Sequence, residues 1–265
     1  MIIYSQILLA KFVGWIAFAK IYPKLLRWVI RRYVKYYKIS LDDFDCNETQ
    51  ISCFNDFFTR QLKPNTRPLG KGIVSPVDAR VYAVGEIHDG QILQIKDQKI
   101  TVEGLLDVDR FTAEYFMSFY LSPGDYHRFH APVDLKVTSI KYIPGMFYSV
   151  RPKIAQKRKV FLKNERVVLH CETAQGKLYL VFVAAQNVGK IELKALGGIC
   201  PDKKGISLFK EFQQSEFQKG DELGVFHMGS SVVLLTEKTP LKQLANYAVK
   251  FGEALSNKGD ADHYV

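Results

Sequence analysis

The chain has few cysteines, and their spacing forms no recognisable metal site. None of the four lies in a Cys-x-x-Cys pair or has a histidine at zinc-finger spacing. A chain of 265 residues is long enough to bury a substantial core without disulfide bonds. We therefore expect reduced thiols in a cytosolic compartment at Cys46, Cys53, Cys171 and Cys200.

Acidic residues are absent from the first 41 positions. Residues 1–39 contain eight lysines and arginines, and subtracting these from the net charge of +10 leaves only +2 for the rest of the chain. Such a localised basic segment favours contact with an anionic membrane surface over binding in a nucleic-acid groove. We predict no nucleic-acid partner.

Long hydrophobic runs are also missing. The longest uncharged run of the N-terminal segment, residues 1–10, is much shorter than the roughly 20 residues that a membrane-spanning helix needs. Ala17-Phe18-Ala19 would suit signal-peptide cleavage, but no basic segment precedes the apolar stretch and Lys11 interrupts it. An acid-free amphipathic N-terminus is also typical of mitochondrial transit peptides, although this one has little serine. We expect neither a spanning helix nor a cleaved signal peptide.

The spacing of residues 24–38 predicts an amphipathic helix that begins after Pro23. Its lysines and arginines recur every three or four residues, while its aromatic residues lie largely elsewhere on the helix. Such a helix suits the lipid headgroup layer, where basic side chains meet anionic lipid and aromatic rings lie at the boundary. The alternative is a helix that packs its apolar stripe on the protein's own core. We expect residues 1–39 to form membrane-associating amphipathic helices.

Residues 40–265 are predicted to form a second domain, which makes the whole chain an α+β protein. Phenylalanines at helical spacing favour a short helix within residues 44–62, and residues 241–254 favour a C-terminal helix. Between them the hydrophobic period changes to two, without helices long enough for parallel crossovers, so a mainly antiparallel barrel or sandwich is expected. The predicted strands are residues 81–87, 92–95, 115–121, 135–143, 166–171, 178–184, 191–196 and 232–235.

A serine pair follows a glycine at the head of an apolar run near the C-terminus. Glycine has no side chain, so the carbonyl group of Gly229 is open to attack by the hydroxyl of Ser230. Serine becomes a nucleophile when a base takes its proton and a third group orients that base. Two histidines, His127 and His130, lie three residues apart, and Asp78 follows a Ser-Pro-Val turn. These are the candidate partners of the serine.

Three other interpretations of these residues remain open from their types alone. His127 and His130 could bind a metal with Asp125 or Asp134, although residues three apart on a strand point to opposite faces. The aspartate, histidine and serine could form the triad of a lipid or ester hydrolase, although the Gly-x-Ser-x-Gly elbow is missing. The chain could also be a non-enzymatic basic membrane-binding module whose Gly-Ser is an ordinary turn.

Five segments together resemble the phosphatidylserine decarboxylase family in order and spacing. The resemblance extends from about residue 11 to residue 235, and the combination of the histidine motif and the Gly-Ser site is specific to that family. The segments are Ser-Pro-Val-Asp at 75–78, Asp-Tyr-His-Arg-Phe-His-Ala-Pro-Val at 125–133, Asn-Glu-Arg-Val-Val at 164–168, Asn-Val-Gly at 187–189 and Gly-Ser-Ser at 229–231.

The resemblance implies that the chain cleaves itself. Asp78 would orient His130, and His130 would take the proton of Ser230, whose oxygen would attack the Gly229 carbonyl. The products would be a β chain, residues 1–229, and an α chain of 36 residues, residues 230–265, that begins with a pyruvoyl group. His127 matches the family position associated with proton donation during decarboxylation.

The resemblance also implies the cofactor and the partners. Decarboxylation needs an electron sink, and the sequence has no Gly-rich phosphate loop for pyridoxal phosphate, so the pyruvoyl ketone made from Ser230 would react with the substrate amine to form a Schiff base. No metal is expected. The implied partners are phosphatidylserine in an anionic membrane, the β and α chains of one precursor and a second copy in a homodimer. The implied location is peripheral, on the cytoplasmic side of the cell membrane.

Three positions differ from the residues that are common in the family. Ala79 stands where glycine usually follows the aspartate, Ser231 where threonine is common and Met228 where leucine is common. Ala79 would add strain beside Asp78 if the backbone there required a positive φ. The other two replacements keep the type of chemistry.

Overall fold

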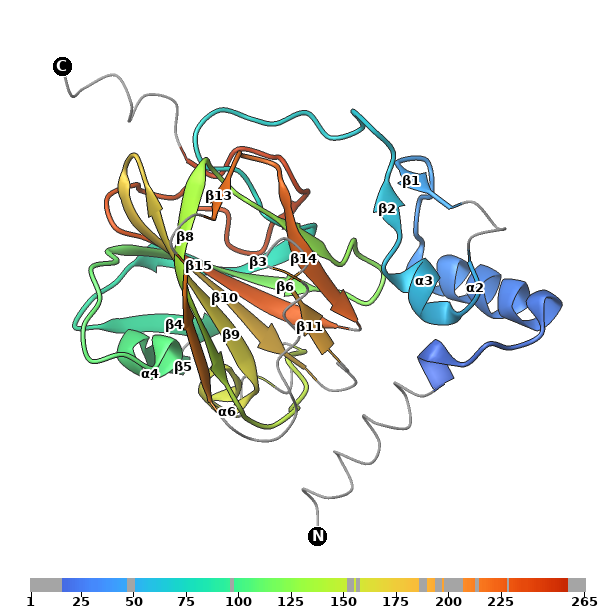
Figure 1. Cartoon of the computed structure of the whole chain (residues 1–265), viewed down its shortest axis with the longest axis horizontal. Helices are drawn as coiled ribbons and strands as arrows, with labels where there is room; N and C mark the ends of the chain where they lie inside the picture. The colour runs from blue at the N-terminus through green and yellow to red at the C-terminus, as the bar shows by residue number, and fades with distance from the viewer. Residues whose placement is uncertain are drawn as a thin grey trace, which may run out of the picture.

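The computed structural model describes residues 16–46, 51–95, 98–151, 155, 158–185, 190–193, 197, 207–212, 215–227 and 229–256. Its largest element is a nine-stranded sheet, and a three-stranded sheet packs against it (Figure 1). Two further sheets have two short strands each. Every pairing between the named strands is antiparallel. The prediction of a mixed fold with mainly antiparallel strands is therefore confirmed.

The large sheet has the strand order β12-β8-β9-β10-β15-β6-β3-β16, and β13 also pairs with β8. Its strands are β3 (Ala79–Glu86), β6 (Tyr115–Leu121), β8 (Leu135–Ile143), β9 (Arg166–Thr173), β10 (Gly176–Ala184), β12 (Leu208–Glu211), β13 (Glu216–Phe217), β15 (Ser230–Thr236) and β16 (Ala248–Val249). The three-stranded sheet contains β11 (Lys190–Glu192), β14 (Glu222–His227) and β7 (Arg128–His130). The two pairs are β1 (Phe44–Asp45) with β2 (Gln61–Leu62), and β4 (Gln91–Ile95) with β5 (Gln98–Thr101).

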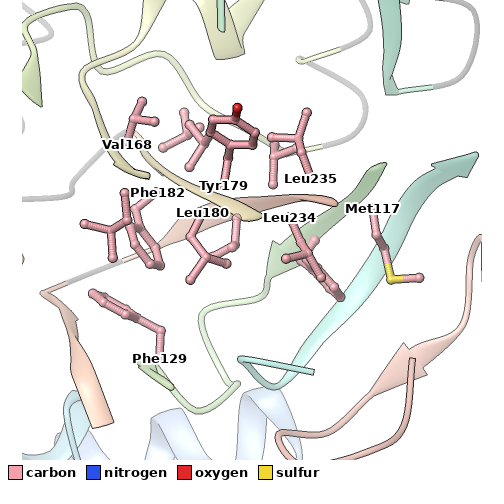
Figure 2. Packing of buried hydrophobic residues seen from close by; sticks show 14 of the residues in the cluster. Met117, Phe129, Val168, Tyr179, Leu180, Phe182, Leu234 and Leu235 are labelled. Atoms are coloured by element: carbon pink, nitrogen blue, oxygen red, sulfur yellow. The ribbon is translucent and has the colours of Figure 1, made fainter. Parts of the chain in front are cut away.

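The core lies between the two larger sheets. The ring of Phe129 on β7 stacks on Phe182 of β10 with centroids 4.1 Å apart, and it contacts Phe226 of β14 at 4.9 Å. Figure 2 shows the rings of Phe129 and Phe182 close together, with Leu180 of the same strand beside Phe182. Because β15 is buried on both faces, its sequence is a continuous apolar run rather than an alternating one.

Helices are short and few in the described residues, apart from α2. They are α2 (Pro23–Tyr37), α3 (Phe54–Phe58), α4 (Val102–Leu106) and α6 (Val160–Lys163). Pro23 begins α2, where its missing N–H costs nothing, and Lys38 in the left-handed conformation ends it. Figure 1 shows α2 beside α3 on one side of the molecule, with the large sheet on the other. No helix in these residues has both the length and the hydropathy required to span a membrane.

The helix predicted for residues 241–254 is not confirmed, because this segment is extended. Leu241 and Ala254 form isolated bridges with Ser256 and Val74, and β16 pairs with β3. The spacing of the apolar residues suggested a helix, but backbone hydrogen bonds to residues 73–81 replace helical ones. Gly252 takes a φ of 91°, which interrupts a helix and which most side chains avoid.

Closure into a barrel is not confirmed either. The path of the large sheet through the described strands ends at β12 on one side and at β16 on the other. The helix predicted within residues 44–62 is confirmed only as α3, because flanking residues form β1 and β2 instead. The eight predicted strands each overlap an observed strand, namely β3, β4, β6, β8, β9, β10, β11 and β15.

Candidate active site

The Gly229–Ser230 peptide bond lies where the chain passes from the small sheet into the large one. β14 ends at His227, and β15 begins at Ser230, which pairs with Ala184 of β10 and Leu121 of β6. The Ser230 side chain is fully buried, and its Oγ has no hydrogen-bond partner among the described residues. The hydroxyls of Ser118 and Ser231 are also buried without a partner in this described part of the chain, so it is the position of Ser230 directly after Gly229 that makes its oxygen the candidate for chemistry.

Gly229 is not required by packing or by its backbone conformation. A Cβ atom added there would meet no neighbouring heavy atom within 4 Å, and its φ lies outside the left-handed range. Other glycines differ, since a Cβ on Gly224 would lie 2.1 Å from the Glu192 carbonyl oxygen. The absence of a side chain and of close neighbours at this position leaves no steric barrier there.

His127 lies at the same corner of the molecule as the Gly-Ser bond. The Phe226 N–H donates to the His127 carbonyl at 2.9 Å, which places His127 beside the end of β14. Its ring Nδ1 donates to the Asp125 carbonyl at 2.9 Å, whereas Nε2 has no partner among the described residues. Complete burial lowers the pKa of His127 to about 3, so the ring is neutral.

His130 lies further from the Gly-Ser bond, opposite Glu222 at the other end of β14. Its Nδ1 donates to the Gly220 carbonyl at 2.8 Å, and its Nε2 is 2.9 Å from the Tyr126 hydroxyl, which can donate to it. The ring stacks on Phe251 with centroids 3.8 Å apart. Burial lowers the pKa of His130, which keeps this ring neutral as well.

In the described part of the chain no hydrogen bond joins the Asp78 and His130 side chains, but Phe251 contacts both. The Phe251 N–H donates to the Asp78 carboxylate at 2.7 Å, and Arg67 Nη2 donates to its other oxygen at 3.2 Å. Burial raises the pKa of Asp78, although Phe251 and Arg67 favour its charged form. Asp78 also lies close enough to Asp125 to help raise its pKa, and the Asp125 carbonyl accepts from His127, so Asp78 and His127 lie in one region of the molecule.

The N-terminal helical segment forms part of the site. The Tyr33 hydroxyl of α2 donates to the Pro123 carbonyl at 2.5 Å, and Arg60 Nη2 donates to the Gly124 and Asp125 carbonyls at 2.8 and 3.1 Å. Phe58 of α3 lies 4.1 Å from the His127 ring, measured between centroids. Burial raises the pKa of Asp125 to about 6. These contacts fix the loop that carries His127.

Sequence reasoning missed His227 and its partners. Its ring Nε2 is 2.9 Å from Glu192 Oε2 on β11, and Nδ1 is 3.1 Å from Asn55 Oδ1 on α3. The only available signal was its position two residues before Gly229. Its partners are 35 and 172 residues away in the sequence, so no local pattern could identify them.

The histidines do not assemble a metal site in the described part of the chain. There, no group of three or more His, Cys, Asp or Glu side chains is placed to hold an ion. Asp134 Oδ1 accepts the Lys219 N–H at 2.7 Å, and the Asp125 carboxylate accepts the Ser122 N–H at 2.6 Å. The two carboxylates considered as ligands are therefore occupied by backbone groups.

Comparison with known proteins identifies the family. The sequence profile described as phosphatidylserine decarboxylase matches residues 54–257.

Three similar proteins are each named phosphatidylserine decarboxylase proenzyme. The one from Legionella pneumophila (strain Lens) is 36% identical over 223 residues, covering 80% of this chain and 79% of the relative. The one from Variovorax paradoxus (strain S110) is 35% identical over 263 residues, covering 94% and 93%. The one from Psychrobacter cryohalolentis is 37% identical over 230 residues, covering 82% and 80%. The chain belongs to the phosphatidylserine decarboxylase family.

Proposed function

We propose that this protein decarboxylates phosphatidylserine to phosphatidylethanolamine, using a pyruvoyl group that it makes from Ser230 when it cleaves itself after Gly229. The observation that carries the proposal is the fully buried Ser230 Oγ without a partner, beside a glycine that neither packing nor backbone conformation requires. The relatives' name, proenzyme, supports a processing step.

Self-cleavage uses only atoms of the chain and water. The Ser230 oxygen loses its proton and bonds to the Gly229 carbonyl carbon, and the bond from that carbon to the Ser230 nitrogen breaks, leaving an ester and an amine. Removal of the Ser230 Cα proton breaks the Cβ–O bond and releases Gly229 as a carboxylate. Water then displaces the Ser230 nitrogen as ammonia, and a ketone remains at residue 230.

We assign His130 as the base for this step and Asp78 as the group that orients it. Their shared contact with Phe251 supports a common role, because both depend on the position of that residue. The His130 ring is neutral in its buried site and can accept a proton. Since its Nε2 faces the Tyr126 hydroxyl, proton transfer from Ser230 requires the ring to leave that hydroxyl or to act through it.

We assign His127 to the decarboxylation step. A pyruvoyl group at residue 230 would draw off the electrons left on the substrate α-carbon as carbon dioxide departs. His127 would give this carbon its proton: its neutral Nε2 would take the proton that the substrate ammonium group loses on reacting with the ketone and pass it to the carbon, a role typically worth about 10²- to 10⁴-fold in rate. The Phe58 ring against His127 keeps water away from it.

The α chain of 36 residues stays in the fold after cleavage in this proposal. Its first strand, β15, is hydrogen-bonded to β10 and β6 along its full length. The new terminus at residue 230 therefore remains beside Ala184 and Leu121.

The substrate is reached at the surface of an anionic membrane, on the cytoplasmic side, by a peripherally bound homodimer. Exposed Leu25, Trp28 and Tyr36 on α2 support this part, because they lie among exposed basic residues such as Lys24 and Arg31. The inner side of α2 packs on the protein itself, through Tyr33. Light scattering of the purified enzyme tests the homodimer.

Replacing Ser230 gives the sharpest test of the function. The wild type should yield a fragment of about 4 kDa, the share of a 30.3 kDa chain that 36 of its 265 residues represent. Intact-mass measurement should find this fragment with a blocked N-terminus. Ser230→Ala should remain whole and release no carbon dioxide from phosphatidylserine. A Ser230→Ala chain that still splits would refute the assignment, and a wild type that stays whole yet hydrolyses esters would support a hydrolase.

Replacing each histidine separates the two steps. We expect His130→Ala to block self-cleavage, because the base is lost. His127→Ala should cleave but release carbon dioxide about 10²- to 10⁴-fold more slowly per pyruvoyl group. Cleavage is measured by intact mass, and pyruvoyl content by a carbonyl-trapping reagent. Equal cleavage defects in both variants would contradict this division of roles.

A further inference from the structure

His227 occupies the last position of β14, directly ahead of the two residues that lead into Ser230. On one side of it, the pairing of β14 with β7 runs only as far as Val225 and Arg128, followed by the Phe226 to His127 hydrogen bond. On the other side, His227 is in register with Lys190 of β11. The backbone ladder thus loosens on the β7 side just before the bond to be cleaved.

The His227 side chain links its own strand, β14, to strand β11 and helix α3. Its Nε2 is 2.9 Å from the Glu192 carboxylate of β11, and its Nδ1 is 3.1 Å from the Asn55 side-chain oxygen of α3. Both neighbours are oxygen acceptors, so the imidazole satisfies them fully when each ring nitrogen carries a proton. His227 and Asn55 are both buried, at 8% and 4% exposure, and Phe18 covers the ring. A buried ring that is held on both of its nitrogens by neighbouring side chains is fixed in orientation.

We propose that His227 is a positioning residue for self-cleavage, which Glu192 and Asn55 hold so that the Gly229 carbonyl lies against the Ser230 hydroxyl. The proposal rests on the proposed function, because it concerns how the same bond is brought to reaction. A Cβ atom at Gly229 would meet nothing within 4 Å, so no packing contact at that position fixes the backbone, and His227 is the nearest preceding described side chain that hydrogen bonds hold. Nucleophilic attack needs the reacting atoms about 3–3.5 Å apart and aligned, and a displacement of about 1 Å can cost roughly 10²-fold in rate.

The test follows self-cleavage of the full-length precursor made by cell-free translation and sampled over time by intact mass. His227→Ala and Glu192→Gln should each slow cleavage about 10²-fold. The double variant should be no slower than either single variant, because both remove the same contact. The melting temperature, measured with Ser230→Ala added to each variant, should change little. His88→Ala is the matched control and should cleave at the wild-type rate, since His88 faces Glu86 at 3.8 Å on the surface with 78% of its side chain exposed.

Three results would overturn the proposal. They are wild-type cleavage in His227→Ala, additive losses in the double variant, or rate losses that follow the losses in melting temperature. If His227→Ala fails to fold, Glu192→Gln keeps the shape of the side chain and still decides the matter. Failure of the proposed function gives a different result, because the wild-type chain itself would then remain whole.

Discussion

The two strands on either side of the Gly229–Ser230 bond are held in different ways. After the bond, all seven residues of β15 are buried, and the strand pairs with β10 and β6 over its whole length. Before the bond, β14 lies in a small sheet, and its pairing with β7 is irregular between Glu222 and Gly224. The end of β14 is held by side chains, through His227, rather than by a regular backbone ladder on both sides.

This difference explains how the fold would survive the proposed cleavage after Gly229. In the proposed cleavage the Ser230 nitrogen leaves, but the other six residues of β15 stay paired with β10 and β6, so the smaller product would keep its place in the core. The side that must adjust during attack and elimination is the β14 side, where packing around Gly229 is open. Helix α3 contacts that side, through Asn55 at His227 and through the ring of Phe58 at His127.

The largest expected effect concerns the β15 side. Leu234 is fully buried between Leu180 and Met117, so Leu234→Ala should lower the free energy of unfolding by about 2–5 kcal/mol. Denaturant unfolding of the uncleaved Ser230→Ala precursor measures this. Leu208→Ala on β12 is the control, because Leu208 is 44% exposed and its loss should change the free energy by less than about 0.5 kcal/mol. Similar losses in both variants would mean that β15 does not anchor the α chain.

A smaller effect is the change in the free energy of unfolding at acid pH, which involves His127 beside β14. The native pKa of His127 is about 3, below its ordinary value of 6.5, so the unfolded chain takes up this proton first as pH falls. Stability from His127 is therefore present above pH 6.5 and is lost below it, by at most about 1.4 kcal/mol per pH unit. The pKa of Asp125, raised to about 6, acts with the opposite sign between pH 6 and 3.8.

Comparing the parent with a His127 variant separates the contribution of His127 to stability from that of other titrating groups. His127→Gln keeps a donor for the Asp125 carbonyl but cannot take up the proton, so its free energy of unfolding should fall less than that of the parent between pH 6.5 and 4. Both proteins should carry Ser230→Ala, so that each is a single chain. A constant difference between them across this range would mean that His127 is not buried as a neutral ring.

The sequence allowed prediction of the parts of the fold that local patterns determine. β6 and β8 match the predicted ranges, because long β-branched and aromatic runs bounded by turns specify strands. The segment at 241–254 was predicted wrongly, because its apolar spacing is compatible with a helix and only pairing with residues 73–81 makes it extended. Tertiary contacts override local preference there.

The candidate site likewise contains residues that the sequence predicts and residues that it does not. Ser230 and His127 could be identified from motifs, and they lie at one corner of the molecule. The contact of His227 with Glu192 and Asn55 could not be predicted, because it joins three elements that are distant in the sequence. Residue types identify candidates for chemistry, whereas the groups that orient them depend on the folded arrangement.

The smallest effect on stability, and the one that separates docking from catalysis, concerns α2. Trp28 is 60% exposed, so Trp28→Ala should change the free energy of unfolding by less than about 0.5 kcal/mol and leave self-cleavage unchanged. It should weaken binding to both neutral and anionic vesicles, because an aromatic ring lies at the lipid boundary in either case. Arg31→Gln should weaken binding to anionic vesicles alone, by about 1 kcal/mol or roughly fivefold, and less so at high salt. Tyr247→Ala is the control, since Tyr247 is 65% exposed beside β16, and equal losses of vesicle binding in Tyr247→Ala and Trp28→Ala would mean that α2 is not the docking surface.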